Sequence, residues 1–150
     1  MAIDRRAEMS LEETDAFLGS QETGVLSLAR AGEPYAIPVS YGYDPTARQF
    51  YMRLVSTPES EKRLFLESDP DARLVVYEED EPTYRSAIAV GTLVGIDPDE
   101  LTVEDIRRYG STKRPLLDIW PDRKDELDIE LYKFDPETIS GRLIAISEGE

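Results

Sequence analysis

Residues 35–43 have the sequence YAIPVSYGY, in which bulky and small side chains alternate at every position. In an extended chain the bulky residues share one face and the small residues share the other. This period of two predicts a β-strand with one face against a core and one nearly bare face. A bare face allows a flat molecule to lie against the backbone, and it equally allows close packing of a neighbouring element.

Further strands are predicted on both sides of this segment. They cover residues 24–30, 49–55, 72–77, 84–96, 128–134 and 138–147. Turn-forming residues lie between several of these strands, at 31–34, 44–47 and 135–137. Strands linked by hairpins predict a mainly β (α+β) fold, with a closed, mostly antiparallel sheet of about six or more strands.

Few and short helices are expected, all peripheral to the sheet. One begins at Ser10, which forms a capping box with Glu13, and extends to residue 18. A second covers residues 57–67, with Pro58 in its first turn, and a third covers residues 102–109.

The size of the chain predicts one domain over residues 1–150. No apolar run approaches the roughly 20 residues that cross a bilayer, and the first residues lack the apolar stretch of a signal peptide. We therefore expect a cytoplasmic protein without a membrane partner. Trp120 is expected in the core or in a dimer interface rather than stacked on a cofactor.

The chain contains no cysteine and no histidine. These absences exclude disulfides, thiolate nucleophiles, the Ser-His-Asp triad and histidine-ligated zinc or haem. The acidic runs at 78–81 and 97–100 do not match a calcium-binding loop, so no metal site is predicted. The groups that remain for catalysis or binding are carboxylates, Lys, Arg, Tyr, hydroxyls, the backbone or a cofactor.

The net charge is −15, from 32 acidic and 17 basic residues. Such a charge disfavours binding to nucleic acid or to an anionic membrane. The acids are spread over the whole chain, and arginine greatly outnumbers lysine. This composition is typical of proteins from salt-loving cells, where strong screening makes an acidic surface tolerable. An ordinary acidic protein is the alternative.

Basic and hydroxyl side chains gather where the strand at 49–55 leads into the helix at 57–67. They are Arg53, Ser56, Thr57, Ser60, Lys62 and Arg63. A helix N-terminus with hydroxyls and cations beside it favours an anion such as a phosphate. In the alternative interpretation, Lys62 and Arg63 pair with glutamates of the same solvated helix.

Four segments in this order resemble the pyridoxamine 5'-phosphate oxidase-like flavin proteins. They are residues 24–29, residues 32–41, the strand with its Ser-x-Lys helix, and residues 84–91. The resemblance covers roughly residues 10–147. It implies a split β-barrel, usually a homodimer that binds two flavin mononucleotides (FMN) between its subunits.

By this resemblance, Arg53, Ser60 and Lys62 lie where the family binds the flavin phosphate, with Ser56 and Arg63 as further members of the group. The segment at 138–142 is similar to the family's last strand, which approaches the partner's flavin. Arg142 is its candidate for an anion or a flavin carbonyl, or else for a surface ion pair.

The strand that lies along the isoalloxazine ring in the family corresponds to four consecutive residues here. They are Ile37, Pro38, Val39 and Ser40.

The resemblance implies an FMN-dependent oxidoreductase acting on a small molecule, with NAD(P)H as a candidate reductant. No catalytic side chain is assigned. The alternatives are a deazaflavin-dependent reductase of the same fold and a non-catalytic flavin-binding protein. Vitamin B6 oxidation is not expected, because residues 140–150 lack the family's basic, histidine-containing C-terminal signature.

Overall fold

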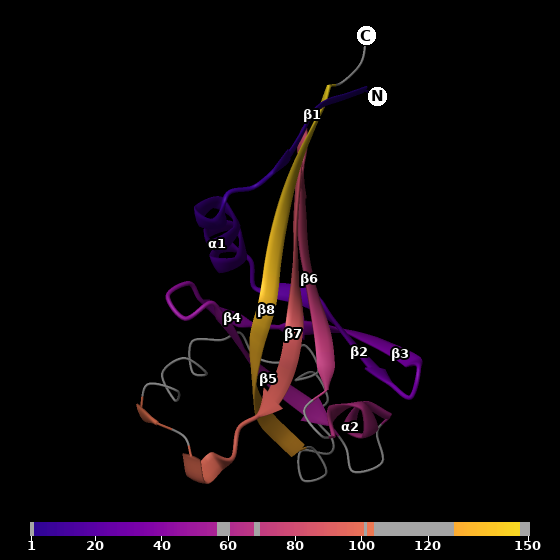
Figure 1. Ribbon diagram of the computed structural model, residues 1–150, viewed down its shortest axis with the longest axis vertical. Coiled ribbons are helices and arrows are strands. Elements are labelled where there is room, and N and C mark those ends of the chain that lie inside the picture. Colours follow the sequence, from indigo (N-terminus) through magenta and orange to yellow (C-terminus); the bar gives the residue numbers. More distant parts are fainter. Residues whose placement is uncertain (1, 57–60, 68–69, 101, 104–127, 148–150) are drawn as a thin grey trace, which may run out of the picture.

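The computed structural model describes residues 2–56, 61–67, 70–100, 102–103 and 128–147. Strands dominate this part of the chain (Figure 1). The elements are β1 (Ala2–Glu8), α1 (Leu11–Ser20), β2 (Thr23–Arg30), β3 (Glu33–Ser40), β4 (Gly42–Asp44), β5 (Gln49–Ser56), α2 (Glu61–Leu66), β6 (Asp71–Asp80), β7 (Thr83–Gly95), the 3-10 helix η1 (Pro98–Glu100) and β8 (Asp128–Ser147).

All eight described strands belong to one antiparallel sheet, which confirms the predicted mainly β fold with short helices. Their order is β3-β2-β6-β7-β8-β5-β4, and β1 pairs with β8. The expectation of a closed sheet is wrong, because among the described strands β3 pairs only with β2 and β4 only with β5. The chain passes from β3 to β4 through Tyr41. The N–H of Tyr41 donates a hydrogen bond to the carbonyl of Glu22 at 3.0 Å.

Two strand predictions are corrected at the ends of the chain. Residues 2–8 were not predicted as a strand, yet β1 pairs with residues 142–147 of β8. β8 is a single strand, although a break was predicted at 135–137. The sheet accommodates Pro136 opposite Gly91 of β7, next to a register shift, where a missing N–H is tolerated.

The other predicted ends of strands and helices differ less from those in the structure. The predicted strand at 35–43 is divided at Tyr41 into β3 and β4. The predicted helix at 57–67 is described as α2 from Glu61, with residues 57–60 outside the described part. Most of the helix predicted at 102–109 also lies outside the described residues.

The bulky face of the YAIPVSYGY segment packs against the core, as its alternation predicts. Val39 and Tyr41 are buried, and Tyr35 and Ile37 are partly buried against the same cluster. The ring of Tyr41 meets Phe50 edge-on at 5.3 Å between centroids. Tyr35 stacks on Phe65 of α2 at 4.8 Å, which attaches the short helix to β3.

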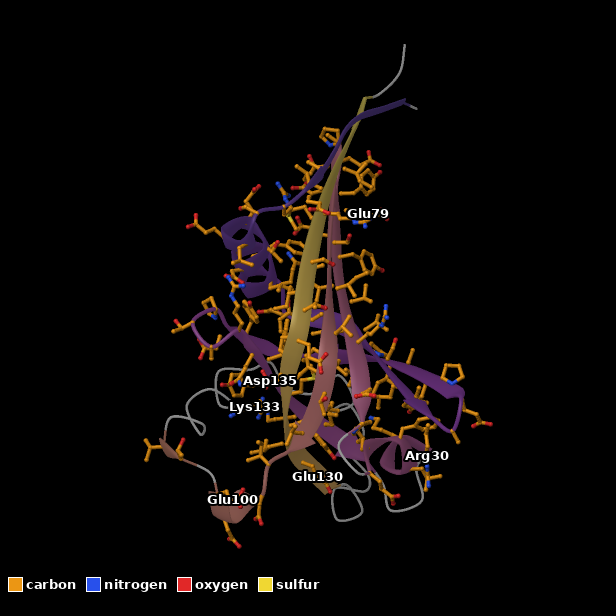
Figure 2. The ribbon with its side chains drawn as sticks, viewed as in Figure 1. Arg30, Glu79, Glu100, Glu130, Lys133 and Asp135 are labelled. Atoms are coloured by element: carbon orange, nitrogen blue, oxygen red, sulfur yellow. The ribbon has the colours of Figure 1, made fainter. Side chains whose placement is uncertain are left out.

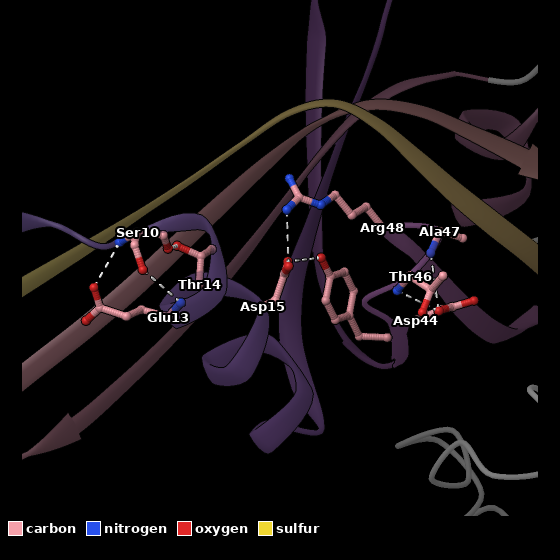
Figure 3. Close-up of polar contacts among 9 residues, drawn as sticks. Ser10, Glu13, Thr14, Asp15, Asp44, Thr46, Ala47 and Arg48 are labelled. Atoms are coloured by element: carbon pink, nitrogen blue, oxygen red, sulfur yellow. Dashed lines mark hydrogen bonds and ion pairs between the residues drawn. The ribbon is translucent and has the colours of Figure 1, made fainter.

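Helix α1 is held by its own cap and by contacts to the β4–β5 hairpin. The predicted capping box is present, with both bonds between Ser10 and Glu13 at 3.1 Å (Figure 3). Asp15 accepts a hydrogen bond from the Tyr43 hydroxyl at 2.6 Å and pairs with Arg48 at 3.2 Å. Burial is the main cause that raises the pKa of the Tyr43 hydroxyl, so it stays a donor at neutral pH.

The long strands β6, β7 and β8 run from the end of the molecule that holds α2 to the end where β1 lies (Figure 1). Along them, Arg85 pairs with Glu78 directly across the sheet at 3.6 Å. None of the described helices is both long and apolar enough to span a membrane.

Candidate functional site

Arg53 lies on the face of β5 that points away from the core. Met52 and Leu54 on either side of it are buried in the core cluster, so the alternation of the strand turns Arg53 outward. The side chain is nevertheless partly buried, and it lies opposite Leu131 of β8. The structure therefore places a cation on a partly covered surface.

Lys133 is a second cation on this face, and sequence reasoning missed it. Lys133, which Figure 2 labels, lies opposite Tyr51 in the β5–β8 register. Tyr51 is two residues before Arg53 and therefore on the same face of β5. The Nζ of Lys133 is 5.7 Å from the centre of the Tyr51 ring, a cation–π distance. Tyr51 is only 1% exposed although it is not part of the core cluster. Only the β5–β8 register brings Lys133 here, since the residues are far apart in the sequence.

Lys62 is buried within α2, with 9% of its surface exposed. It therefore does not lie on a fully solvated helix face. Burial lowers the pKa of the Lys62 ammonium, because a charge loses hydration in the protein interior. A buried ammonium is stabilised when an anion binds next to it.

The end of β2 lies against the C-terminal half of α2. Arg30 donates from its guanidinium to the carbonyl of Leu64 at 3.4 Å and lies next to α2 (Figure 2). Strand β5, which contains Arg53, also ends towards α2, which contains Lys62 (Figure 1).

Three other predicted members of the phosphate group are not described at the level of side chains. Ser56 ends β5 opposite Asp128, and Arg63 belongs to α2, but both side chains lie outside the described part. Ser60 lies wholly outside the described residues, as does Trp120.

Strand β3 contains the four residues predicted to lie along a flavin ring. Val39 is buried and Ile37 is half-buried against the core, so neither presents its side chain outward. Ser40 is also buried, and Pro38 is exposed. Because β3 is the last strand on its side of the described sheet, its second edge leaves backbone groups available to a ligand.

Within one chain, Arg142 does not lie near Arg53. It is exposed on β8, opposite Ser86 of β7 and Glu8 of β1. Leu131, which faces Arg53, lies much earlier on the same strand. At about 3.3 Å per residue, the two positions are separated by roughly 35 Å.

The open antiparallel sheet with short helices is a split-barrel type of fold. The chain belongs to the pyridoxamine 5'-phosphate oxidase family, whose model matches residues 10–143. A comparison with curated proteins finds no match. The family match confirms the resemblance inferred from the four sequence segments.

Solved structures with this fold include proteins described as flavin-binding. An FAD-binding protein from Mesorhizobium loti has 18% identity and a TM-score of 0.71, covering 97% of this chain and 100% of its own. The FAD binding protein from Mycobacterium smegmatis has 13% identity and a TM-score of 0.68, covering 93% and 99%. An FAD and heme binding protein from the same organism has 18% identity and a TM-score of 0.61, covering 97% and 75%.

Proposed function

We propose that this chain binds FMN and acts as a flavin-dependent oxidoreductase. The observation that carries the proposal is the buried Lys62 at the end of the molecule where Arg53 is partly buried. Two partly or fully buried cations are unusual in a chain of net charge −15 with nearly twice as many acids as bases. A phosphate is the flavin group that matches them, because it accepts charge-assisted hydrogen bonds from both.

The hydroxyls of Ser56 and Ser60 and the guanidinium of Arg63 complete the proposed phosphate site. Their place in the sequence, between Arg53 and the end of α2, supports this assignment. Lys133 extends the positive charge along the same face of β5. These residues bind the cofactor and fix its position, and they do not take part in proton or hydride transfer.

The flavin ring is proposed to lie along the free edge of β3. A flat ring edge carries donors and acceptors that pair with backbone groups, and Pro38 and Ala36 add small, exposed surfaces there. The bound flavin supplies reversible hydride acceptance, and the protein supplies position and shields one face of the ring from water. The substrate then approaches the other face.

We expect the purified protein to bind FMN and to quench its fluorescence, with riboflavin binding at least tenfold more weakly because it lacks the phosphate. Fluorescence titration at high salt measures both affinities. Oxidation of NAD(P)H by the FMN-loaded protein then separates an oxidoreductase from a flavin-binding protein without activity. Tighter binding of a deazaflavin phosphate than of FMN would assign a deazaflavin as the cofactor in place of FMN. Equal affinities for riboflavin and FMN would contradict the phosphate site.

We also propose that the protein is a homodimer through the outward face of the sheet. Val75 and Ile88 lie opposite each other there, and Tyr77 is the next outward residue on β6. Tyr77 is 63% exposed and Ile88 is 38% exposed. A second copy related by a two-fold axis would cover this apolar strip with the same strip.

Ile88→Glu is expected to shift the dimer towards monomer, because it places a desolvated charge in the proposed interface. Light scattering at several protein concentrations measures the shift. Leu11→Glu is the matched control, since Leu11 is 54% exposed on α1, away from this strip. A wild-type monomer at high salt, or an unchanged dimer in Ile88→Glu, would contradict the proposed interface.

A further inference from the structure

A hollow of about 570 Å³ lies on the sheet at β2, β6 and β7, which run side by side (Figure 1). Small or apolar residues line much of it, namely Ser27, Ala29, Pro34, Val90 and Gly91. Its volume lies within the range of about 300 to 1,000 Å³ that is usual for small-molecule sites. None of these residues belongs to the proposed phosphate site.

A β-bulge directs Glu137 towards this hollow. Val90 of β7 lies opposite Thr138, and the next residue, Gly91, lies opposite Pro136. Glu137 is therefore the extra residue of the bulge, without a partner on β7, and it is exposed and lines the hollow. Bulges of this kind redirect a side chain out of the regular alternation of the strand.

Arg73 supplies the opposite charge. It lies between Ser27 of β2 and Val90 of β7 in the register of the sheet, and it is exposed. In the part of the chain that the structure describes, Arg73 belongs to no ion pair, unlike Arg48 and Arg85. Asp71, two residues earlier on the same face of β6, also lines the hollow.

The charges around the hollow restrict what it binds. A phosphate or a dicarboxylate would be repelled by Asp71 and Glu137 as well as by the net charge of −15. Among the described residues there is no group of three or more potential ligands that could hold a metal ion. A zwitterion has no net charge, so the acidic surface does not repel it. Its negative group can pair with Arg73 and its positive group with Asp71 and Glu137.

We propose that this hollow binds a small zwitterion with a flat apolar body. Its carboxylate pairs with the guanidinium of Arg73, whose fork of donors matches two carboxylate oxygens. Its ammonium lies between the carboxylates of Glu137 and Asp71. The apolar body covers Ala29 and Pro34. This site adjoins the proposed flavin ring, because Ser27 lies opposite Ala36 of β3, and it adjoins the proposed dimer strip, because Arg73 and Val75 share one face of β6. It uses none of the proposed phosphate-binding residues.

The test uses three probes of the same shape with the full-length protein, namely L-phenylalanine, phenethylamine and 3-phenylpropanoate. Calorimetry at high salt is expected to show millimolar or tighter binding of L-phenylalanine and at least tenfold weaker binding of the two singly charged probes. Amide NMR shifts are expected at Ser27, Ala29 and Gly91, which line the hollow. Equal binding of all three probes, or no saturable binding, would overturn the proposal.

Arg73→Gln and Glu137→Gln are each expected to weaken L-phenylalanine binding about tenfold to a hundredfold. Arg85→Gln is the matched control and should leave binding unchanged, because Arg85 pairs with Glu78 and does not line the hollow. FMN affinity, measured in the same variants, should stay at the wild-type value. A loss of FMN affinity in Arg73→Gln would assign the hollow to the flavin and overturn the zwitterion site. Binding of L-phenylalanine without FMN binding would support this site and contradict only the proposed function.

Discussion

Gly91→Ala is expected to destabilise the folded protein by about 3 kcal/mol or more. A Cβ at this position would lie 2.6 Å from the Cα of Pro136 and would also collide with the carbonyl oxygen of Asp135. Both neighbours are backbone atoms of β8 at the register shift, so no change of rotamer relieves the overlap. The two strands must separate locally, which weakens the pairing of β7 with β8.

Denaturant unfolding at a fixed protein concentration measures this change in the free energy of unfolding. Gly19→Ala is the matched control, because a Cβ at this position of α1 would meet no neighbouring side chain or strand within 4 Å. Alanine is the better helix former, so this control should stabilise the protein by about 0.5 to 1 kcal/mol. A free energy of unfolding for Gly91→Ala close to that of the wild type would show that β7 and β8 do not approach so closely.

Lys62→Met and Arg53→Met are each expected to weaken FMN binding about tenfold to a hundredfold. Each change removes one charge-assisted partner of the phosphate and keeps a long side chain in place, so the packing around α2 and β5 is preserved. Riboflavin affinity should be nearly unchanged, because riboflavin has no phosphate. Fluorescence titration of both flavins gives the two affinities in each variant.

The dependence of binding on pH gives an independent readout for Lys62. Because burial lowers the pKa of this ammonium from its usual 10.5, the free protein loses the charge at a lower pH than an exposed lysine does. The affinity for FMN relative to riboflavin should therefore fall as the pH rises from neutral through the lowered pKa. Taking the ratio cancels any ionisation of the ring that the two flavins share.

In Lys62→Met this fall of the affinity ratio should disappear. Arg85→Met serves as the control for Arg53→Met, because it removes an arginine from the same sheet at a pair with Glu78. FMN affinities equal to the wild type in both Lys62→Met and Arg53→Met would place the phosphate elsewhere in the molecule.

Several features of the fold follow from short stretches of sequence. The alternation in YAIPVSYGY predicts which face of β3 packs on the core, and the buried Val39 and Tyr41 confirm it. The capping box at Ser10 and Glu13 predicts the start of α1. The turn between β2 and β3 has positive φ at Ala31 and Gly32, which suits the two-residue hairpin there. Each of these features depends on residues that are close together in the chain.

The candidate site was only partly predictable for the same reason. Arg53 and Lys62 are predicted as site residues because they are close in sequence and the family resemblance includes both. The burial of Lys62 and the position of Lys133 beside Tyr51 could not be found, because they depend on helix packing and on the β5–β8 register. The pairing of β1 with β8 was missed because its short, charged sequence has no strong strand pattern.

The sequence by itself determined the mainly β fold, the inward face of β3 and the cap of α1. Only the tertiary structure decided the open sheet, the single long β8 and the bulge at Glu137. Local patterns act through the conformational preferences of neighbouring residues, which a sequence displays directly. Strand register is chosen by hydrogen bonds and burial summed over residues far apart in the chain, so it emerges only when the whole sheet has formed.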